Sequence, residues 1–125
     1  EVGGTLRILD GNTHVLIKKI SFEIPGVSDE AIQPVGVRLT SDGKYGFIAL
    51  GPANRIAVID AQTLEVIKYI LVGQRVWQLA LTSDGKLLVS TNGVSNDITV
   101  INVEKLKAIK SIKVGRFPWG VVIHP

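Results

Sequence analysis

The sequence is a tandem repeat with a period of 42 residues. Several blocks return with this shift and with no gap between them. They are Ser41–Lys44 with Ser83–Lys86, Asn54–Asp60 with Asn96–Asn102, Val72-Gly73 with Val114-Gly115, and Trp77 with Trp119. Each copy of such a repeat is one structural unit, which becomes stable by burying its apolar faces against its neighbours. The repeat therefore restricts the fold to architectures that stack similar units.

The start of the chain is an earlier, partial copy. Leu6–Asp10 matches Ile56–Asp60 with a shift of 50 residues, so about eight extra residues separate this copy from the next. The extra residues fall within Phe22–Ile32, which predicts a longer loop there. Two full copies, the second half of one and the start of another amount to about three units.

Each full copy is predicted to form four short strands. In the second copy the strand-like runs are Trp77–Leu81, Lys86–Thr91, Ile98–Val103 and Leu106–Val114. Turn residues follow the first two runs, in Ser83-Asp84-Gly85 and Asn92-Gly93. The last two runs alternate apolar and polar side chains, as strands do, and no long helix is predicted.

Four strands in about 42 residues are typical of a β-propeller blade. We therefore predict an all-β fold made of blades of four antiparallel strands. A sandwich or jelly roll also contains many short strands, but it does not repeat whole four-stranded units without gaps. The predicted division is 1–33 for the back half of one blade plus the long loop, 34–75 and 76–116 for two blades, and 117–125 for the innermost strand of a closing blade.

The repeat resembles that of the YVTN β-propeller family, whose unit contains a PDGK turn, a V-T/S-N strand end, V-x-V-I-D and a final V-G. The corresponding residues here are Thr82–Lys86, Val89–Asn92, Thr99–Asn102 and Val114-Gly115. Ser83 replaces the usual proline, and Asn102 replaces the aspartate that Asp60 retains. Both departures affect turns and leave the fold prediction unchanged.

Longer strings, ALGPANRIAVID and VGRFPWGV among them, are similar to the C-terminal blades of a bacterial propeller group associated with pyrroloquinoline-quinone-dependent alcohol catabolism. This resemblance implies a secreted or periplasmic protein of seven blades. Seven blades need about 290 residues, and about three blades cannot close a ring. We therefore expect either a fragment of a longer protein or a homodimer that closes the ring. In the homodimer, Phe117–His124 of one chain pairs with the Leu6–Ile20 region of the other.

Composition and residue spacing exclude several kinds of chemistry. The chain has no cysteine, which excludes disulfides, zinc–thiolate sites and cysteine nucleophiles. The formal net charge is +3 and the basic residues are scattered, so no nucleic-acid partner is predicted. No apolar run approaches the roughly 20 residues of a membrane-spanning helix. Neither His14 nor His124 has a second ligand at metal-binding spacing.

The repeated charged residues are predicted to form turns. Gly43-Lys44 and Gly85-Lys86 lack the upstream glycine of a phosphate loop. An aspartate or asparagine recurs at the end of the third strand of each copy, where capping a turn is favoured over catalysis. These residues are Asp10, Asp60 and Asn102. We predict no catalytic, cofactor-binding or metal-binding residue.

One face of the molecule is predicted to bind a partner. In a four-stranded blade, the loop before the innermost strand lies on the same face as the loop between the second and third strands. We call this face the rim. It collects arginine, tryptophan and amide side chains, which recognition surfaces use. The predicted rim residues are Arg75, Trp77, Asn92, Asn96, Arg116, Trp119, Asn54 and Arg55. The competing interpretation is that both tryptophans pack between neighbouring blades.

Two classes of function follow. The first is a non-enzymatic binding or scaffold propeller, periplasmic and linked by resemblance to quinoprotein alcohol catabolism, with a protein or small-molecule partner at the rim. The alternative is a quinoprotein-type enzyme or cofactor-binding accessory whose site lies largely in N-terminal blades outside this sequence. The fold alone does not separate them, because propellers host many functions.

Overall fold

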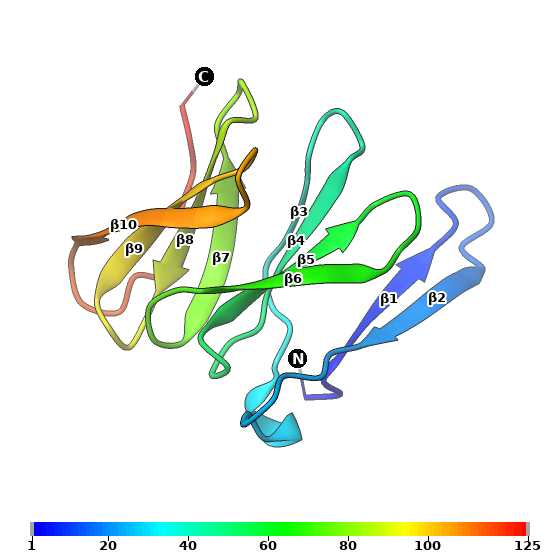
Figure 1. Cartoon of the computed structure of the whole chain (residues 1–125), viewed down its shortest axis with the longest axis horizontal. Coiled ribbons are helices and arrows are strands. Elements are labelled where there is room, and N and C mark those ends of the chain that lie inside the picture. Colours follow the sequence, from blue (N-terminus) through cyan, green and yellow to red (C-terminus); the bar gives the residue numbers. More distant parts are fainter. Residues whose placement is uncertain (1, 125) are drawn as a thin grey trace.

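The computed structural model describes residues 2–124. Residue 1, the first of the predicted half blade, and residue 125, the last of the predicted closing strand, lie outside the described residues. Three antiparallel sheets stand side by side (Figure 1). The N-terminal hairpin consists of β1 (Thr5–Leu9) and β2 (Leu16–Ser21). The central blade consists of β3 (Val37–Leu39), β4 (Tyr45–Ala49), β5 (Arg55–Asp60) and β6 (Val66–Leu71). The C-terminal blade consists of β7 (Val76–Leu81), β8 (Leu87–Asn92), β9 (Asp97–Asn102) and β10 (Lys107–Lys113).

Both blades are simple meanders in which each strand pairs with the next strand in the sequence. The predicted all-β fold of four-stranded antiparallel blades is therefore confirmed. The observed bounds differ from the predicted runs by one residue, at one end of β7 and at both ends of β8, β9 and β10. The extra residues between β2 and β3 contain a short 3-10 helix, η1 (Asp29–Ala31).

The repeated Ser-Asp-Gly-Lys sequence forms the turn between the first and second strands of each blade. Gly43 and Gly85 have φ of +68° and +69°, a left-handed conformation that glycine adopts without strain. In the second copy, Asp84 Oδ1 accepts the N–H of Lys86 at 3.0 Å, and the Thr82 hydroxyl accepts the N–H of Leu87 at 3.1 Å. The turn interpretation of these residues is confirmed.

The turn between the third and fourth strands is capped by the recurring aspartate or asparagine. Asp60 Oδ1 accepts the N–H groups of Gln62 and Thr63 at 2.8 and 2.9 Å. Asn102 Oδ1 accepts the N–H of Lys105 at 2.7 Å. Asp10 holds its turn in the same way, through the N–H groups of residues 12 and 13. The predicted turn-capping role is therefore confirmed in all three copies.

The central blade is covered on both faces. One face packs on the N-terminal hairpin and the loop after it, in a cluster that contains Ile20, Phe22, Ile48 and Leu50. The other face packs on the C-terminal blade, in a cluster that contains Phe47 and Leu79. Burying one such side chain completely contributes about 1.5–3 kcal/mol, so these two interfaces hold the sheets together.

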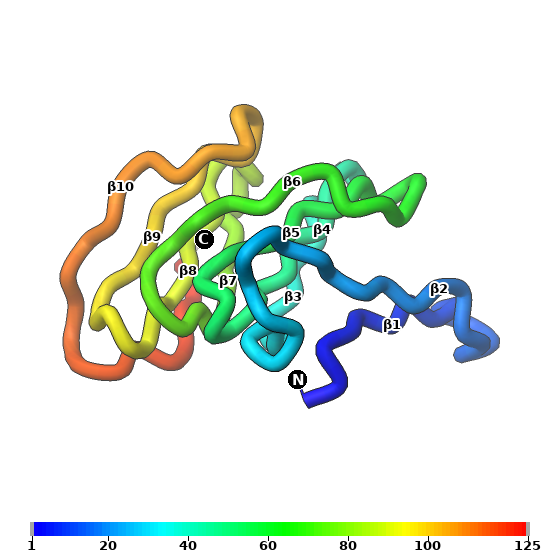
Figure 2. Tube along the Cα trace, turned by 60° about the horizontal axis from the view of Figure 1, so that its bottom comes forward, coloured from blue at the N-terminus to red at the C-terminus, as the bar shows by residue number. Residues whose placement is uncertain are grey.

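The segment 117–124 runs beside the C-terminal blade, close to β7 and β8 (Figure 2). It was predicted as an innermost strand, but within residues 2–124 it forms no strand. A strand requires a ladder of hydrogen bonds to a neighbour, and no such neighbour for this segment lies in the described part of the chain.

The predicted direct pairing of residues 117–124 with the 6–20 region of a second copy is not supported by the topology. β1 and β2 correspond in sequence to β5 and β6, which are the third and fourth strands of a blade. In the central blade, β4 stands between the innermost strand and β5. An innermost strand placed directly beside β1 would therefore leave the position of the second strand empty.

Candidate functional site

The rim lies at one end of the two blades. It is formed by the β4–β5 and β8–β9 turns and by the connections that follow β6 and β10. These segments lie at the lower end of the molecule in Figure 1, together with η1. The predicted rim residues therefore lie in these turns and connections, or in the ends of the strands beside them, as Arg55, Trp77 and Asn92 do.

Aromatic and arginine side chains stack at this end. The ring centroids of Trp77 and Trp119 are 4.3 Å apart, with an angle of 32° between the ring planes. The guanidinium carbon of Arg75 lies 4.7 Å from the centroid of the Trp77 ring, a cation–π distance. Arg116 lies over the ring of Phe117 in the same way, at 5.3 Å. We call these five residues the rim platform.

The platform combines an anchored ring with exposed rings. Trp77 is partly buried, and its indole packs on the backbone of Gly93: a Cβ added to Gly93 would lie 2.5 Å from Trp77 Nε1. Trp119 and Phe117 are 61% and 65% exposed. The exposed Trp119 ring thus rests on a tryptophan that the blade itself fixes.

The predicted rim asparagines fix the loops that carry the platform. Asn54 Oδ1 accepts the N–H of Arg75 at 2.8 Å, and Asn96 Oδ1 accepts the N–H of Phe117 at 2.9 Å. Arg75 and Phe117 have φ of 54° and 53°, in the left-handed region that bulky residues seldom adopt. Such a conformation persists only where the surroundings impose it, and the two asparagines contribute to imposing it.

The junction between innermost segments differs from one blade to the next. Gly36 N donates directly to the backbone oxygen of Trp77 at 3.0 Å. At the next junction Gln78 replaces this glycine, and the Thr91 hydroxyl bridges the gap: it accepts from Gln78 N at 3.1 Å and donates to the backbone oxygen of Trp119 at 2.8 Å. A Cβ at Gly36 would lie 2.6 Å from the Trp77 oxygen, so a larger residue there requires wider spacing.

Two predicted rim residues do not present their side chains to a partner in the way expected. Asn92 is fully buried, with 0% exposure, and its Nδ2 donates to Asp97 and Thr99 inside the C-terminal blade. Its prediction as a surface contact is therefore corrected. Arg55 donates from Nη1 to the backbone oxygen of Ala53 at 2.8 Å, which turns its side chain to its own β4–β5 turn.

Three residues that matter at the rim were not predicted: Thr91, Ser95 and Gly93. Thr91 and Gly93 lie in the V-T/S-N strand end and the Asn-Gly turn, but neither pattern indicates a role at the rim, because the contacts concerned join different segments. The difference between equivalent positions of the repeat could have found two of them. Thr91 and Ser95 replace Ala49 and Ala53 of the central blade, so the second copy gains hydroxyl groups where the first has methyl groups.

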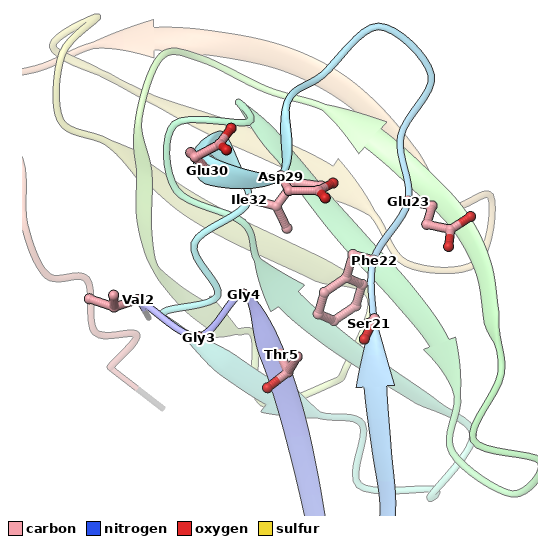
Figure 3. A pocket seen from close by; sticks show the side chains of 10 residues that line it. All are labelled: Val2, Gly3, Gly4, Thr5, Ser21, Phe22, Glu23, Asp29, Glu30 and Ile32. Carbon is pink, nitrogen blue, oxygen red and sulfur yellow. The ribbon is translucent and has the colours of Figure 1, made fainter.

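A cavity of about 600 Å³ lies away from the platform, beside the rim end of the N-terminal hairpin (Figure 3). Its lining includes three carboxylates, from Glu23, Asp29 and Glu30. The cavity lies beside the start of β1. Of the described strands, only β2 pairs with β1, so the other edge of β1 has no partner strand. The cavity is thus a consequence of the half blade, and the platform remains the candidate site.

Within residues 2–124, no three histidine or carboxylate side chains are grouped closely enough to hold a metal ion. None of the described residues belongs to a helix long and apolar enough to cross a membrane.

Comparison with known proteins gives one family match. The model of a family described as YNCE-like beta-propeller matches residues 10–124. No curated protein matches the chain.

The chain is similar to several solved structures. Hydrazine synthase of Kuenenia stuttgartiensis is 28% identical, with a TM-score of 0.68, over 78% of this chain and 28% of that chain. The dihydro-heme d1 dehydrogenase NirN, in complex with DHE, is 18% identical, with a TM-score of 0.71, over 89% and 22%. A putative 6-phosphogluconolactonase of Bacteroides fragilis is 23% identical, with a TM-score of 0.79, over 93% and 35%. The last two likenesses concern the fold alone. This chain spans 22–35% of the length of these proteins.

Proposed function

We propose that this chain, which belongs to the YNCE-like β-propeller family, is a binding or scaffold module that recognises its partner at the rim platform and performs no chemistry there. The observation that carries the proposal is the stack itself. Trp119 is 61% exposed and yet held in place, by its ring contact with Trp77 and by its backbone bond to Thr91. A preformed aromatic surface loses little side-chain freedom on binding.

The charges around the platform indicate the chemistry of the partner. Arg75 and Arg116 bring two guanidinium groups to the rings. Lys113, three residues before Arg116, adds a third cation and donates to the backbone oxygen of Ser95. The rim carboxylate of Asp97 already accepts bonds from Asn92 and Ser95. The partner therefore carries a carboxylate next to an aromatic or apolar group, whether on a small molecule or on a protein.

The proposed setting is the periplasm or the cell exterior, beside pyrroloquinoline-quinone-dependent alcohol oxidation. Its support is the similarity of strings such as VGRFPWGV to the propeller group of that pathway. Pyrroloquinoline quinone, a flat ring system with carboxylates, also has the chemistry that the platform favours.

The test is a titration followed by tryptophan fluorescence, because Trp77 and Trp119 are the chain's two tryptophans. Pyrroloquinoline quinone and an acidic peptide with a central phenylalanine serve as separate probes. We expect one probe to saturate the signal, and Arg75→Ala with Arg116→Ala to weaken its binding at least about tenfold.

The matched control is Arg7→Ala with Arg38→Ala, which removes the same charge from exposed positions on β1 and β3. If the control weakens binding as much as the rim variant, charge alone explains the effect and the site assignment is wrong. If neither probe saturates, the proposed partner chemistry is wrong.

The alternative function is that of an enzyme or a cofactor-binding accessory. Its specific support is that hydrazine synthase of Kuenenia stuttgartiensis, which is 28% identical over 78% of this chain, is named as an enzyme. Alcohol oxidation measured after addition of pyrroloquinoline quinone and calcium to the intact protein decides this point. Turnover above that of the cofactor alone favours the enzyme, and its absence favours the binding module.

A further inference from the structure

The C-terminal blade buries a polar network where the central blade buries apolar side chains. On its face toward the central blade stand Ser90, Asn92 and Thr99, with exposures of 0%, 0% and 2%. The residues at equivalent positions of the central blade are Ile48, Leu50 and Ala57, also at 0%. The same fold therefore accepts an apolar set at these positions.

The network is fully hydrogen bonded. Asn92 Nδ2 donates to Thr99 Oγ1 at 2.9 Å and to Asp97 Oδ1 at 2.8 Å, and Asn92 Oδ1 accepts the Ser90 hydroxyl at 3.1 Å. No buried side-chain nitrogen or oxygen of the described residues lacks a partner. A satisfied polar network adds little stability over an apolar core, but it imposes one geometry on its members.

That geometry reaches the rim platform. The Ser95 hydroxyl donates to Asp97 Oδ1 and accepts the N–H of Gln74, each at 2.8 Å. Gln74 immediately precedes Arg75, and its own oxygen accepts the N–H of Val94 at 3.0 Å. The network thus holds, from inside the blade, the loop that carries Arg75 and leads into β7, where Trp77 lies.

Gly73 shows how closely the loop fits the network. A Cβ added to it would lie 2.5 Å from Ser95 Oγ and 2.6 Å from Asn92 Nδ2, and closer still to Asp97 Oδ1. The backbone of the loop therefore contacts three members of the network directly. A shift of the network cannot leave the loop where it is.

We infer that Asn92, Asp97 and Ser95 are positioning residues for the rim platform, which they keep stacked before any partner arrives. This role rests on the binding function proposed above and deepens it, because it assigns the preorganisation of the site to a buried polar network. The apolar set of the central blade stabilises a blade interface, whereas the polar set also fixes a loop.

The test measures the platform in the absence of a partner. Two indoles at the observed separation of 4.3 Å couple their electronic transitions and give paired bands of opposite sign in circular dichroism. We expect Ser95→Ala, which introduces the residue found at position 53 of the central blade, to remove most of this signal. Ser95 is only partly buried, so the melting temperature should stay within about 5 °C of the starting value.

A second variant transplants the apolar set of the central blade, with Ser90→Ile, Asn92→Leu, Ser95→Ala and Thr99→Ala. We expect it to retain the β-sheet signal and to lose the paired tryptophan bands. The single substitution Ser95→Thr, which keeps the hydroxyl, should retain the paired tryptophan bands. The control is Ser111→Ala, which removes a bond of 3.3 Å to Thr99 at the end of the network farthest from Gln74 and should leave the bands unchanged.

Paired bands of full strength in both Ser95→Ala and the transplanted variant would overturn the positioning role. A lower melting temperature with unchanged bands in the folded protein would also overturn it, because that result describes a purely structural network. The failure of the binding function is a separate result: Arg75→Ala with Arg116→Ala would leave probe binding unchanged, whatever the bands do.

Discussion

At the scale of single residues, the repeat shows the same turn held by two different side chains. Asp60 and Asn102 occupy equivalent positions, and Oδ1 accepts two backbone N–H groups in Asp60 and one in Asn102. The bonds from the N–H groups of Thr63 and then Gln62 lower the pKa of the Asp60 carboxyl. Only the aspartate therefore makes the turn sensitive to pH.

A lowered pKa in the folded state contributes stability that is present above the unfolded pKa and is lost as pH falls through the folded value. We expect Asp60→Asn to match the parent near neutral pH and to lose less stability below about pH 4. Asp60→Ala should melt a few degrees lower at both pH values, because the cap is gone. Thermal unfolding at about pH 7 and pH 3 measures both effects.

The control for this prediction is Asp29→Asn, which removes an exposed carboxylate outside these turns. If it changes the acid response as much as Asp60→Asn does, the response reflects net charge and not the turn.

At the scale of the elements, positions 78 and 91 depend on each other at the junction between innermost segments. Thr91 is 1% exposed and links Gln78 N to the Trp119 oxygen, where the preceding junction has Gly36 and no intervening hydroxyl. A hydroxyl at position 91 is thus required only because position 78 carries a side chain.

We predict that Thr91→Ala costs about 1–3 kcal/mol of unfolding free energy, because a partly buried backbone donor and a backbone acceptor both lose their partner. It should also speed amide exchange in residues 117–124. Adding Gln78→Gly, which costs about 0.5–1 kcal/mol by itself, recreates the arrangement of the preceding junction. Denaturant unfolding of the four members of this cycle should show a favourable coupling between positions 78 and 91.

If the two substitutions add without coupling, the hydroxyl bridge does not connect these segments. The matched control pair is Thr91→Ser with Gln78→Gly, which keeps the hydroxyl and should show little gain.

The strands and turns could be predicted from the sequence, because the repeat places turn residues at regular intervals and alternation marks the strands between them. The roles at the rim could be predicted only in part. Asn54 and Asn96 were assigned to the right face, but their bonds to Arg75 and Phe117 join residues 21 positions apart and depend on left-handed turns. The burial of Asn92 depends on which face of β8 points to the central blade, and an Asn-Gly pair suggests an exposed turn instead.

At the scale of the whole molecule, the three sheets differ in how much of their surface is buried against neighbouring segments. The central blade has neighbours on both faces, and four of the five residues of β4 are buried. β1 has no buried residue, and β2 has one. Local stability should follow this order.

We predict that hydrogen exchange is slowest in β4 and β5 and fastest in β1, β2 and residues 117–124, because few buried contacts resist local opening there. Exchange followed by mass spectrometry of peptides from this chain measures the order. Protection of the N-terminal hairpin equal to that of β4 would show that another chain covers it. Dilution of the sample shows whether that chain is a second copy of this one, since protection by a second copy decreases as the protein concentration decreases.

The hydroxyl bridge at Thr91 has a geometric consequence for a closed propeller, whose innermost strands line a central channel. The bore of that channel follows from the distances between successive innermost strands. Direct bonding at Gly36 draws the first two innermost segments together, and the Thr91 bridge beside Gln78 places β7 and residues 117–124 farther apart by the width of one oxygen atom. The residue at this position of the repeat, glycine at 36 and glutamine at 78, thus influences the bore of the channel.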